Sequence, residues 1–207
     1  QRNITMSLIC KDDETLRRTS VRKLKPLAFN LNLIQQLSEL SWLPVDNNVS
    51  IAEMEQAFRS MVRTKRFSRW TDLLLVSVGN AAFCRLFNGD LWAMLTVFAA
   101  TMLGFLVKQQ LTRLKYNPLG VIILSAFTAS MAAACAVLFQ IGSTPQIALA
   151  SSVLFLVPGV QMINSIMDLM HGHILMGISR GIHSIMMIAC IAIGLSATML
   201  IVGVNSL

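Results

Sequence analysis

Charged side chains almost disappear from this 207-residue chain after residue 69, and this split constrains the fold more than any motif does. Residues 70–207 carry eight charges, whereas residues 1–69 carry twelve basic and seven acidic side chains. Over the whole chain 13% of residues are charged and 55% are hydrophobic, while soluble domains usually carry about 25% charged residues. The split predicts a small polar domain, residues 1–69, joined to a membrane domain, residues 70–207.

The polar domain begins with strand signals. Residues 4–10 alternate in polarity and are rich in strand formers. Residues 11–14 are all charged or polar and suit a turn, after which residues 18–21 suit a returning strand. This pattern predicts a hairpin of two short strands.

Two helices are predicted after the hairpin. Leucine and isoleucine recur at steps of three and four from Leu33 onward, which is typical of an amphipathic helix, and Pro44 is expected to end it. Ser50 followed by Glu53 is a capping box that opens a second helix, over about residues 51–62. Together with the strands, these helices predict a small α/β domain whose beginning is missing.

Five apolar stretches follow, each near the roughly 20 residues that a membrane-spanning helix needs. Short polar or helix-breaking segments separate them, and the longest of these is a predicted loop over residues 108–117. The predicted spans cover residues 70–86, 91–107, 118–141, 147–168 and 175–204. The fold class is therefore mainly α: a polytopic helical membrane protein with five transmembrane helices and a small α/β N-terminal domain.

Lysine and arginine in the loops predict the orientation, because cytoplasmic loops carry an excess of both. The N-terminal domain is strongly basic, and the loop 108–117 contains Lys108, Arg113 and Lys115. The loops at residues 88–90 and 142–146 contain neither residue type. Both observations predict a cytoplasmic N-terminus and an external C-terminus. Topology thus explains the net charge of +7, and no nucleic acid is expected as a partner.

The fourth stretch contains a predicted helix break. Pro158 and Gly159 should break or bend the helix and free backbone groups that must then find partners. After the break, polar residues at steps of three and four share one helical face, namely Gln161, Asn164, Ser165, Asp168 and His171. Secondary transporters build substrate sites from broken helices of this kind. The alternative is a packing kink whose polar groups are satisfied within the protein.

Further polar residues of the membrane domain join this face as candidates. Asn80 in the first span needs a hydrogen-bond partner, either another helix or a substrate, and Arg85 follows near the outer end of that span. Arg180 could pair with Asp168 or present a positive charge to an anion, although an interfacial arginine that only sets topology is the alternative. The candidate binding or transport residues are Asn80, Arg85, Pro158, Gly159, Asn164, Asp168, His173 and Arg180.

Other features indicate packing and argue against catalysis. Small residues recur every four positions in two adjacent stripes, and a G-x-x-x-G follows in the fifth span, both typical of close helix contacts in lipid. The stripes are Ser125, Ala129 and Ala133 beside Ala126, Ser130 and Ala134, and the glycines are Gly177 and Gly181. The cysteines are scattered, and no nucleophile motif, metal-ligand spacing or phosphate-binding loop occurs. No enzyme activity, metal or cofactor is expected, so transport would use a gradient.

Several segments resemble the threonine/serine exporter family. They are residues 80–90, the Ser152–Gly159 stretch that ends in the Pro-Gly pair, Ile163-Asn164-Ser165, Asp168 and Gly172-His173. The resemblance covers nearly the whole chain and is closest to the larger subunit, which has a cytoplasmic domain followed by five spans. Gln161 departs from it, since many relatives carry a second proline or an apolar residue there.

The resemblance implies a subunit of a secondary transporter in the bacterial cytoplasmic membrane that exports small hydrophilic metabolites. Threonine and serine are the expected substrates, with succinate or another dicarboxylate as the alternative. A second, smaller five-helix subunit, a homo-oligomer or both are expected as partners within the lipid bilayer. A membrane scaffold or regulatory subunit that transports nothing is the rival class of function.

Overall fold

The computed structural model describes residues 3–9, 17–23, 31–47, 51–62 and 68–203. The chain divides into two compact units, residues 1–66 and residues 67–207. Each unit is described here by itself.

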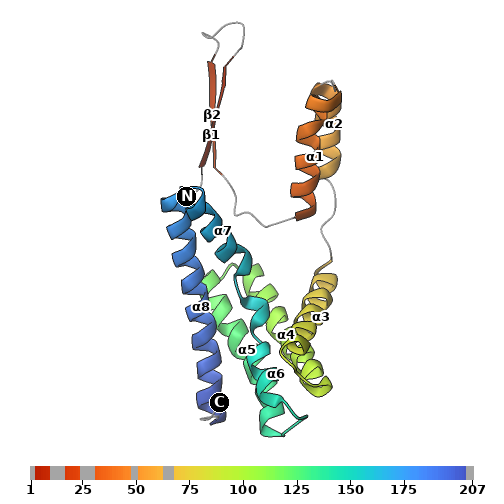
Figure 1. Ribbon diagram of the computed structural model, residues 1–207, viewed down its shortest axis with the longest axis vertical. Helices are drawn as coiled ribbons and strands as arrows, with labels where there is room; N and C mark the ends of the chain where they lie inside the picture. Colours follow the sequence, from red (N-terminus) through yellow and green to blue (C-terminus); the bar gives the residue numbers. More distant parts are fainter. Residues whose placement is uncertain (1–2, 10–16, 24–30, 48–50, 63–67, 204–207) are drawn as a thin grey trace. The chain divides into compact units, whose positions relative to one another are not determined.

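A β-hairpin opens the first unit. Strands β1 (Asn3–Ile9) and β2 (Arg17–Lys23) pair antiparallel, with Thr5 opposite Val21 (Figure 1). The hydroxyl oxygens of Ser7 and Thr19 lie opposite each other and are hydrogen-bonded at 2.9 Å. Both predicted strands are therefore confirmed, with β2 longer than expected.

Two helices complete the described part of the first unit. Helix α1 (Leu31–Asn47) contains Pro44 and continues beyond it, so the prediction that the proline ends this helix is wrong. Proline removes one backbone donor, and near a helix end this costs a single hydrogen bond. Helix α2 (Ile51–Val62) has the predicted bounds, whereas the capping Ser50 lies outside the described residues. In the described part of this unit the strands pack on each other and the helices pack on each other, so one packed α/β domain is not confirmed.

The second unit is helical throughout its described part (Figure 1). Helices α4, α5 and α8 are long and apolar enough to cross a membrane, and α6 with η1 and α7 forms a bent pair that adds a fourth crossing if it is one span. The bounds are α3 Arg69–Leu86, α4 Leu91–Arg113, α5 Pro118–Leu138, α6 Pro145–Ser151, η1 Leu154–Leu156, α7 Gly159–Met170 and α8 Ile174–Val202. The described residues thus contain three or four candidate spans.

The predicted count of five spans is not confirmed, because α3 differs from the others. It has 18 residues, about 27 Å of helix, with Arg69 and Asp72 in its first turn and Arg85 in its last. The predicted loop 108–117 also needs correction. Helix α4 continues to Arg113, so most of that segment is helical.

Small residues let α5 pack closely on two neighbours. A Cβ added to Gly104 of α4 would lie 2.7 Å from Ala129 Cβ and 3.0 Å from the Ser125 carbonyl oxygen. On the adjacent stripe, a Cβ added to Gly194 of α8 would lie 2.8 Å from Ala126 Cβ. The six stripe residues are all buried. One stripe therefore contacts α4 and the other α8, which confirms the predicted packing role.

Helices α7 and α8 form a hairpin joined at Gly172, whose φ is +80°. The hydroxyl of Ser165 on α7 donates to the Gly177 carbonyl oxygen of α8 at 2.7 Å. A Cβ added to Gly177 would meet Leu169 Cγ at 2.6 Å, and one added to Gly181 would meet the Ser165 hydroxyl at 2.9 Å. The G-x-x-x-G pair is thus a packing surface for α7.

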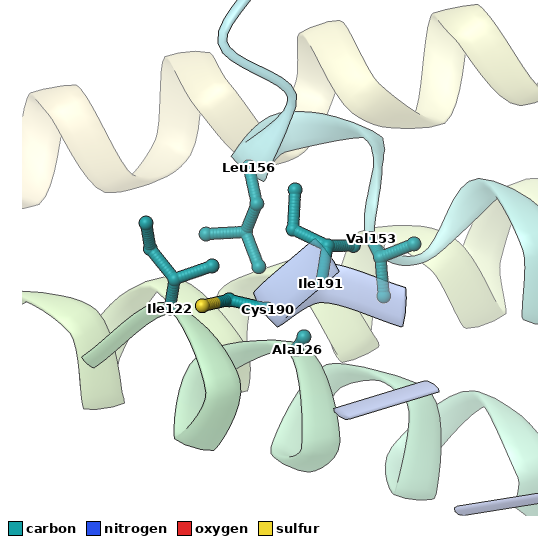
Figure 2. Packing of buried hydrophobic residues seen from close by; sticks show 6 residues of the cluster. All are labelled: Ile122, Ala126, Val153, Leu156, Cys190 and Ile191. Atoms are coloured by element: carbon teal, nitrogen blue, oxygen red, sulfur yellow. The ribbon is translucent and has the colours of Figure 1, made fainter. Parts of the chain in front are cut away.

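An apolar cluster anchors the segment between α6 and α7. Val153 and Leu156 pack against residues of α5 and α8 in this cluster, as Figure 2 shows. The members from α5 and α8 are Ile122, Ala126, Cys190 and Ile191. The interruption of the fourth span is therefore held by the centre of the bundle.

Candidate functional site

The candidate site is built around the interruption between α6 and α7. Helix α6 ends at Ser151, and α7 begins at Gly159 at an angle of 59° to the preceding segment. Pro158 has φ −81° and ψ 54°, and the Gly159 N–H donates to the Val157 carbonyl oxygen at 2.9 Å, which makes an inverse γ-turn. The predicted break at Pro158 and Gly159 is confirmed.

Asn80 supplies a partner for a carbonyl group that the break leaves free. Its side chain is 4% exposed, and Nδ2 donates to the Ser151 carbonyl oxygen at 3.1 Å and to Thr101 Oγ1 at 2.6 Å. The Ser151 carbonyl oxygen identifies which end of the amide carries the nitrogen, because a carbonyl oxygen can only accept. Asn80 therefore binds α3 to α4 and to the end of α6, and within the described residues its Oδ1 accepts no hydrogen bond.

A cavity of about 410 Å³ lies between α3 and the interruption. Asn80 is the polar side chain among its lining residues, and the remainder are apolar or glycine. The lining residues are Val76, Gly79, Asn80, Phe83, Phe87, Leu154, Phe155 and Val157. The volume is in the range of small-molecule sites, which are largely apolar with few polar groups.

Asp168 and Arg180 form an ion pair between α7 and α8. Arg180 Nη1 lies 2.6 Å from Asp168 Oδ2, and the side chains are 43% and 22% exposed, respectively. The predicted pairing is confirmed, so neither charge is free. An ion pair with this much exposure contributes little to stability by itself.

The remaining residues of the polar face on α7 have different surroundings. Asn164 is half-buried, and its side chain makes no hydrogen bond within the described residues. Gln161 Oε1 is buried without a partner there, whereas Nδ1 of the exposed His171 lies 2.8 Å from the Met167 carbonyl oxygen. His173 is also exposed, and its backbone N–H donates to the Asp168 carbonyl oxygen at 2.8 Å. On α7, the amide side chains of Asn164 and Gln161 therefore keep hydrogen-bonding atoms that have no partner among the described residues.

Arg85 lies apart from these groups. Its Nη1 donates to the Gly89 carbonyl oxygen at 3.1 Å, which closes the turn between α3 and α4. Arg85 is not among the residues that line the cavity. Its position suits a turn-stabilising role better than the predicted contact with a substrate.

Lys108 is a residue near the interruption that sequence reasoning treated as part of a loop. It is half-buried on α4, and its Nζ lies 5.8 Å from the ring centroids of both Phe105 and Phe155. These two rings meet edge to face with centroids 6.1 Å apart, and Phe155 belongs to η1. The spacing of Phe105 and Lys108, three residues apart on one helical face, is a signal that could have revealed this.

The Asp90 carboxylate links the turn between α3 and α4 to the turn before α6. It accepts hydrogen bonds from the Ala93 N–H at 2.9 Å, the Ser143 N–H at 2.9 Å and the Thr144 hydroxyl at 3.0 Å. The bonds from the Ser143 and Ala93 backbone hold the pKa of this carboxyl below its ordinary value. Asp90 is thus both the N-cap of α4 and a link to the turn before α6.

In the described part of the chain, no group of three or more histidine, cysteine or acidic residues could hold a metal ion.

Comparison with known proteins identifies the family. A family model described as "Putative threonine/serine exporter" matches residues 2–202. The chain belongs to this family. Within the threonine/serine exporter family, the chain is 33% identical over 194 residues to a Klebsiella aerogenes protein named "Probable succinate transporter subunit YjjP". It is 32% identical over 195 residues to the Escherichia coli K12 protein of that name. Each match covers 91% of this chain and 73% of the relative.

No solved structure matches the chain. Membership of the threonine/serine exporter family, together with several apolar helices, makes the chain a transport protein of the membrane. The interrupted α6–α7 segment, the cavity beside it and the Asp168–Arg180 pair therefore lie in a chain of a transporter family.

Proposed function

We propose that the chain is one subunit of a secondary transporter that exports small hydrophilic metabolites across the bacterial cytoplasmic membrane. The observation that carries the proposal is the interrupted helix, whose free carbonyl at Ser151 is bound by Asn80 beside a cavity. Discontinuous helices with binding sites at the interruption recur in transporters driven by gradients. The sequence contains no phosphate-binding loop that would couple transport to ATP.

The proposed topology has five spans, with α3 as the first, the N-terminus in the cytoplasm and the C-terminus outside. Its support is the linkage of Asp90 to Ser143 and Thr144, which joins the α3–α4 turn to the segment before α6. In the proposed topology both segments lie on the outer side. The loop charges agree with this orientation, because Arg113 and Lys115 lie at the opposite end of α4 from Asp90.

The proposed substrate is a small metabolite that carries a carboxylate. Threonine or serine, the expected substrates from the resemblance, would place its ammonium near Asp168 and its carboxylate near Arg180. Because Asp168 is already paired with Arg180, support for an amino acid is weakened. The two relatives named as succinate transporter subunits support succinate as the second candidate.

The proposed mechanism uses the break as a hinge. Substrate would enter the cavity beside Asn80, whose Oδ1 can accept a hydrogen bond. Helix α7 would then change its angle at Pro158, breaking and reforming the Asp168–Arg180 pair, with Asn164 offering an amide to the substrate. Asp168 and His173 are the proposed carriers of a coupling proton.

The proposed assembly includes a partner, either a second and smaller five-helix subunit or another copy of this chain. Both relatives are named as subunits, which supports a multi-component transporter. Large apolar side chains cover the outer faces of α7 and α8, including Ile163, Met170, Leu175 and Ile185. In a membrane these faces contact lipid or a partner helix.

The deciding experiment measures efflux of labelled threonine, serine and succinate from loaded vesicles that contain the full-length protein, with and without its natural partner. Asp168→Asn and Asn164→Ala are expected to reduce efflux by about tenfold, the effect of losing a charge or hydrogen bond at a binding site. Asp72→Asn is the matched control, because Asp72 is exposed at the start of α3. An active transporter unaffected by both site variants would refute the site, and a protein that moves none of the substrates would favour the scaffold function.

A further inference from the structure

Lys108 is a positive charge near the interruption between α6 and α7, and it has no acidic partner among the described residues. Its Nζ lies over the rings of Phe105 and Phe155, 5.8 Å from each centroid, and it forms no ion pair or hydrogen bond in the described part of the chain. The side chain is half-buried on α4. Aromatic rings attract an ammonium group, but they replace only part of the hydration that a buried charge loses.

The other basic residues of the membrane unit have partners or face solvent. Arg85 donates to Gly89, and Arg180 is paired with Asp168. Arg69 at the start of α3, and Arg113 and Lys115 at and beyond the end of α4, are exposed. Among the described basic residues of this unit, Lys108 therefore carries a half-buried charge that no acidic side chain compensates.

Phe155 connects this lysine to the cavity. The ring belongs to η1 and lines the cavity that Asn80 also lines. It is one of the two rings over which the Lys108 ammonium lies. A Cβ added to Gly104, one helical turn before Lys108, would lie 3.1 Å from Phe155 Cζ. The ring is therefore in contact with α4, and it forms part of the cavity wall.

We propose that Lys108 binds a carboxylate of the substrate at the interruption and that Phe155 is the ring displaced when the carboxylate enters. This inference rests on the proposed transport function. A carboxylate replaces the lost hydration of the ammonium with a charge-assisted hydrogen bond, which an aromatic ring cannot do.

The same arrangement determines which charge the site prefers. Asp168 and Arg180 neutralise each other, whereas Lys108 brings an uncompensated positive charge beside Phe155 of the cavity wall. A dicarboxylate brings more negative charge to this lysine than a zwitterionic amino acid does. Lys108 is therefore a specificity-determining residue that favours dicarboxylates.

The first test compares Lys108→Gln, Lys108→Arg and Lys115→Gln in vesicles that contain the full-length protein and its natural partner. Lys108→Gln is expected to lower succinate efflux about tenfold or more, the cost of one charge-assisted contact. Threonine efflux is expected to fall by a smaller factor, so the succinate-to-threonine ratio decreases. Lys108→Arg should retain most of the succinate efflux, and Lys115→Gln, which removes an exposed charge, should leave both rates unchanged.

The second test does not depend on transport. The purified full-length protein is treated with an amine-acetylating reagent, and acetylation of each lysine is measured by mass spectrometry. Succinate is expected to slow the acetylation of Lys108 relative to sodium chloride of the same ionic strength. Threonine should protect it less, and acetylation of Lys115 should be the same in all three solutions.

The two tests separate the inference from the function on which it rests. If the wild-type protein moves succinate or threonine while Lys108→Gln leaves the ratio unchanged and succinate does not protect Lys108, the role of Lys108 is refuted and the transporter stands. If succinate protects Lys108 while the wild-type protein moves neither substrate, the transport function is refuted and the carboxylate site stands. If neither effect is found, both are wrong.

Discussion

At the scale of single residues, Asn80 stabilises the interruption more directly than any other side chain. A helix broken within a membrane leaves carbonyl groups that water cannot reach, and each must find a donor in the protein. Asn80 Nδ2 serves the Ser151 carbonyl oxygen and Thr101 together. One amide therefore joins α3, α4 and the end of α6 at the interruption.

Replacing this amide tests that role. Asn80→Ala is expected to lower the free energy of unfolding by about 1–2 kcal/mol, because the Ser151 carbonyl loses its donor and interhelical hydrogen bonds in membranes contribute about 0.6–1.7 kcal/mol. Thermal denaturation of the purified protein in detergent measures the change. Asn164→Ala is the matched control, since the Asn164 side chain makes no hydrogen bond within the described residues. Equal stability of the two variants would contradict the structural role of Asn80.

The sequence predicted that Asn80 needs a hydrogen-bond partner and that Arg180 could pair with Asp168, and both predictions have the same reason. A polar group in an apolar segment needs a partner, and few partners are available. Lys108 was not predicted, because its environment depends on Phe155, which lies 47 residues further along the chain and reaches α4 only through the interruption. The need of a polar group in an apolar segment for a partner can be inferred from that segment alone, whereas the ring beside Lys108 comes from a distant part of the chain.

At the scale of elements, composition was sufficient to predict most helices but not their ends. The starts of α4 at Leu91 and α5 at Pro118 agree with the sequence, because Asp90 and Asn117 cap these helices by accepting backbone hydrogen bonds. The predicted end of α4 at residue 107 was wrong. Lysine and arginine form helices readily, whereas their charges were interpreted as a loop. The break at Pro158 was correct, because proline has no backbone donor.

The packing of α8 on α5 can be tested with one methyl group. Gly194→Ala is expected to lower the free energy of unfolding by about 1–3 kcal/mol, the usual cost of overpacking. The added Cβ would lie 2.7 Å from the Ile123 carbonyl oxygen and 3.0 Å from the Phe127 nitrogen, both backbone atoms. Gly120→Ala makes the same change in α5, where a Cβ meets nothing within 4 Å, and should be neutral or slightly stabilising. Thermal denaturation in detergent compares the two, and equal effects would refute close packing at Gly194.

At the scale of the membrane unit, the two ends of the bundle are stabilised by different interactions. Near the start of α4, one carboxylate links two turns that are more than 50 residues apart in sequence. Near the turn between α7 and α8, the ion pair that joins these two helices is partly exposed. A transporter must open toward each side in turn, so the Asp90 link is the contact that would have to break for the end proposed to face outward to open.

The pKa of Asp90 makes this link sensitive to acid. Hydrogen bonds from Ser143 and Ala93 lower the pKa of the folded carboxyl below its ordinary value, so the ionised form stabilises the folded protein. This contribution is complete above the pKa of the unfolded carboxyl, about 3.9, and it is lost as the pH falls through the lower pKa of the folded state. Asp90→Ala should therefore unfold at a lower temperature than the wild type at pH 7, and the difference should shrink below about pH 4.

Thermal denaturation in detergent at several values between pH 7 and pH 3 measures this difference. Asp72→Ala is the control, because it removes an exposed acidic residue from the first turn of α3 and no turn depends on it. A difference between Asp90→Ala and the wild type that stays constant down to pH 3 would mean that the ionised carboxylate does not hold the two turns together. A loss of stability that fades with acid would identify Asp90 as the link, and the same variant would then be expected to increase the rate at which the outer end opens.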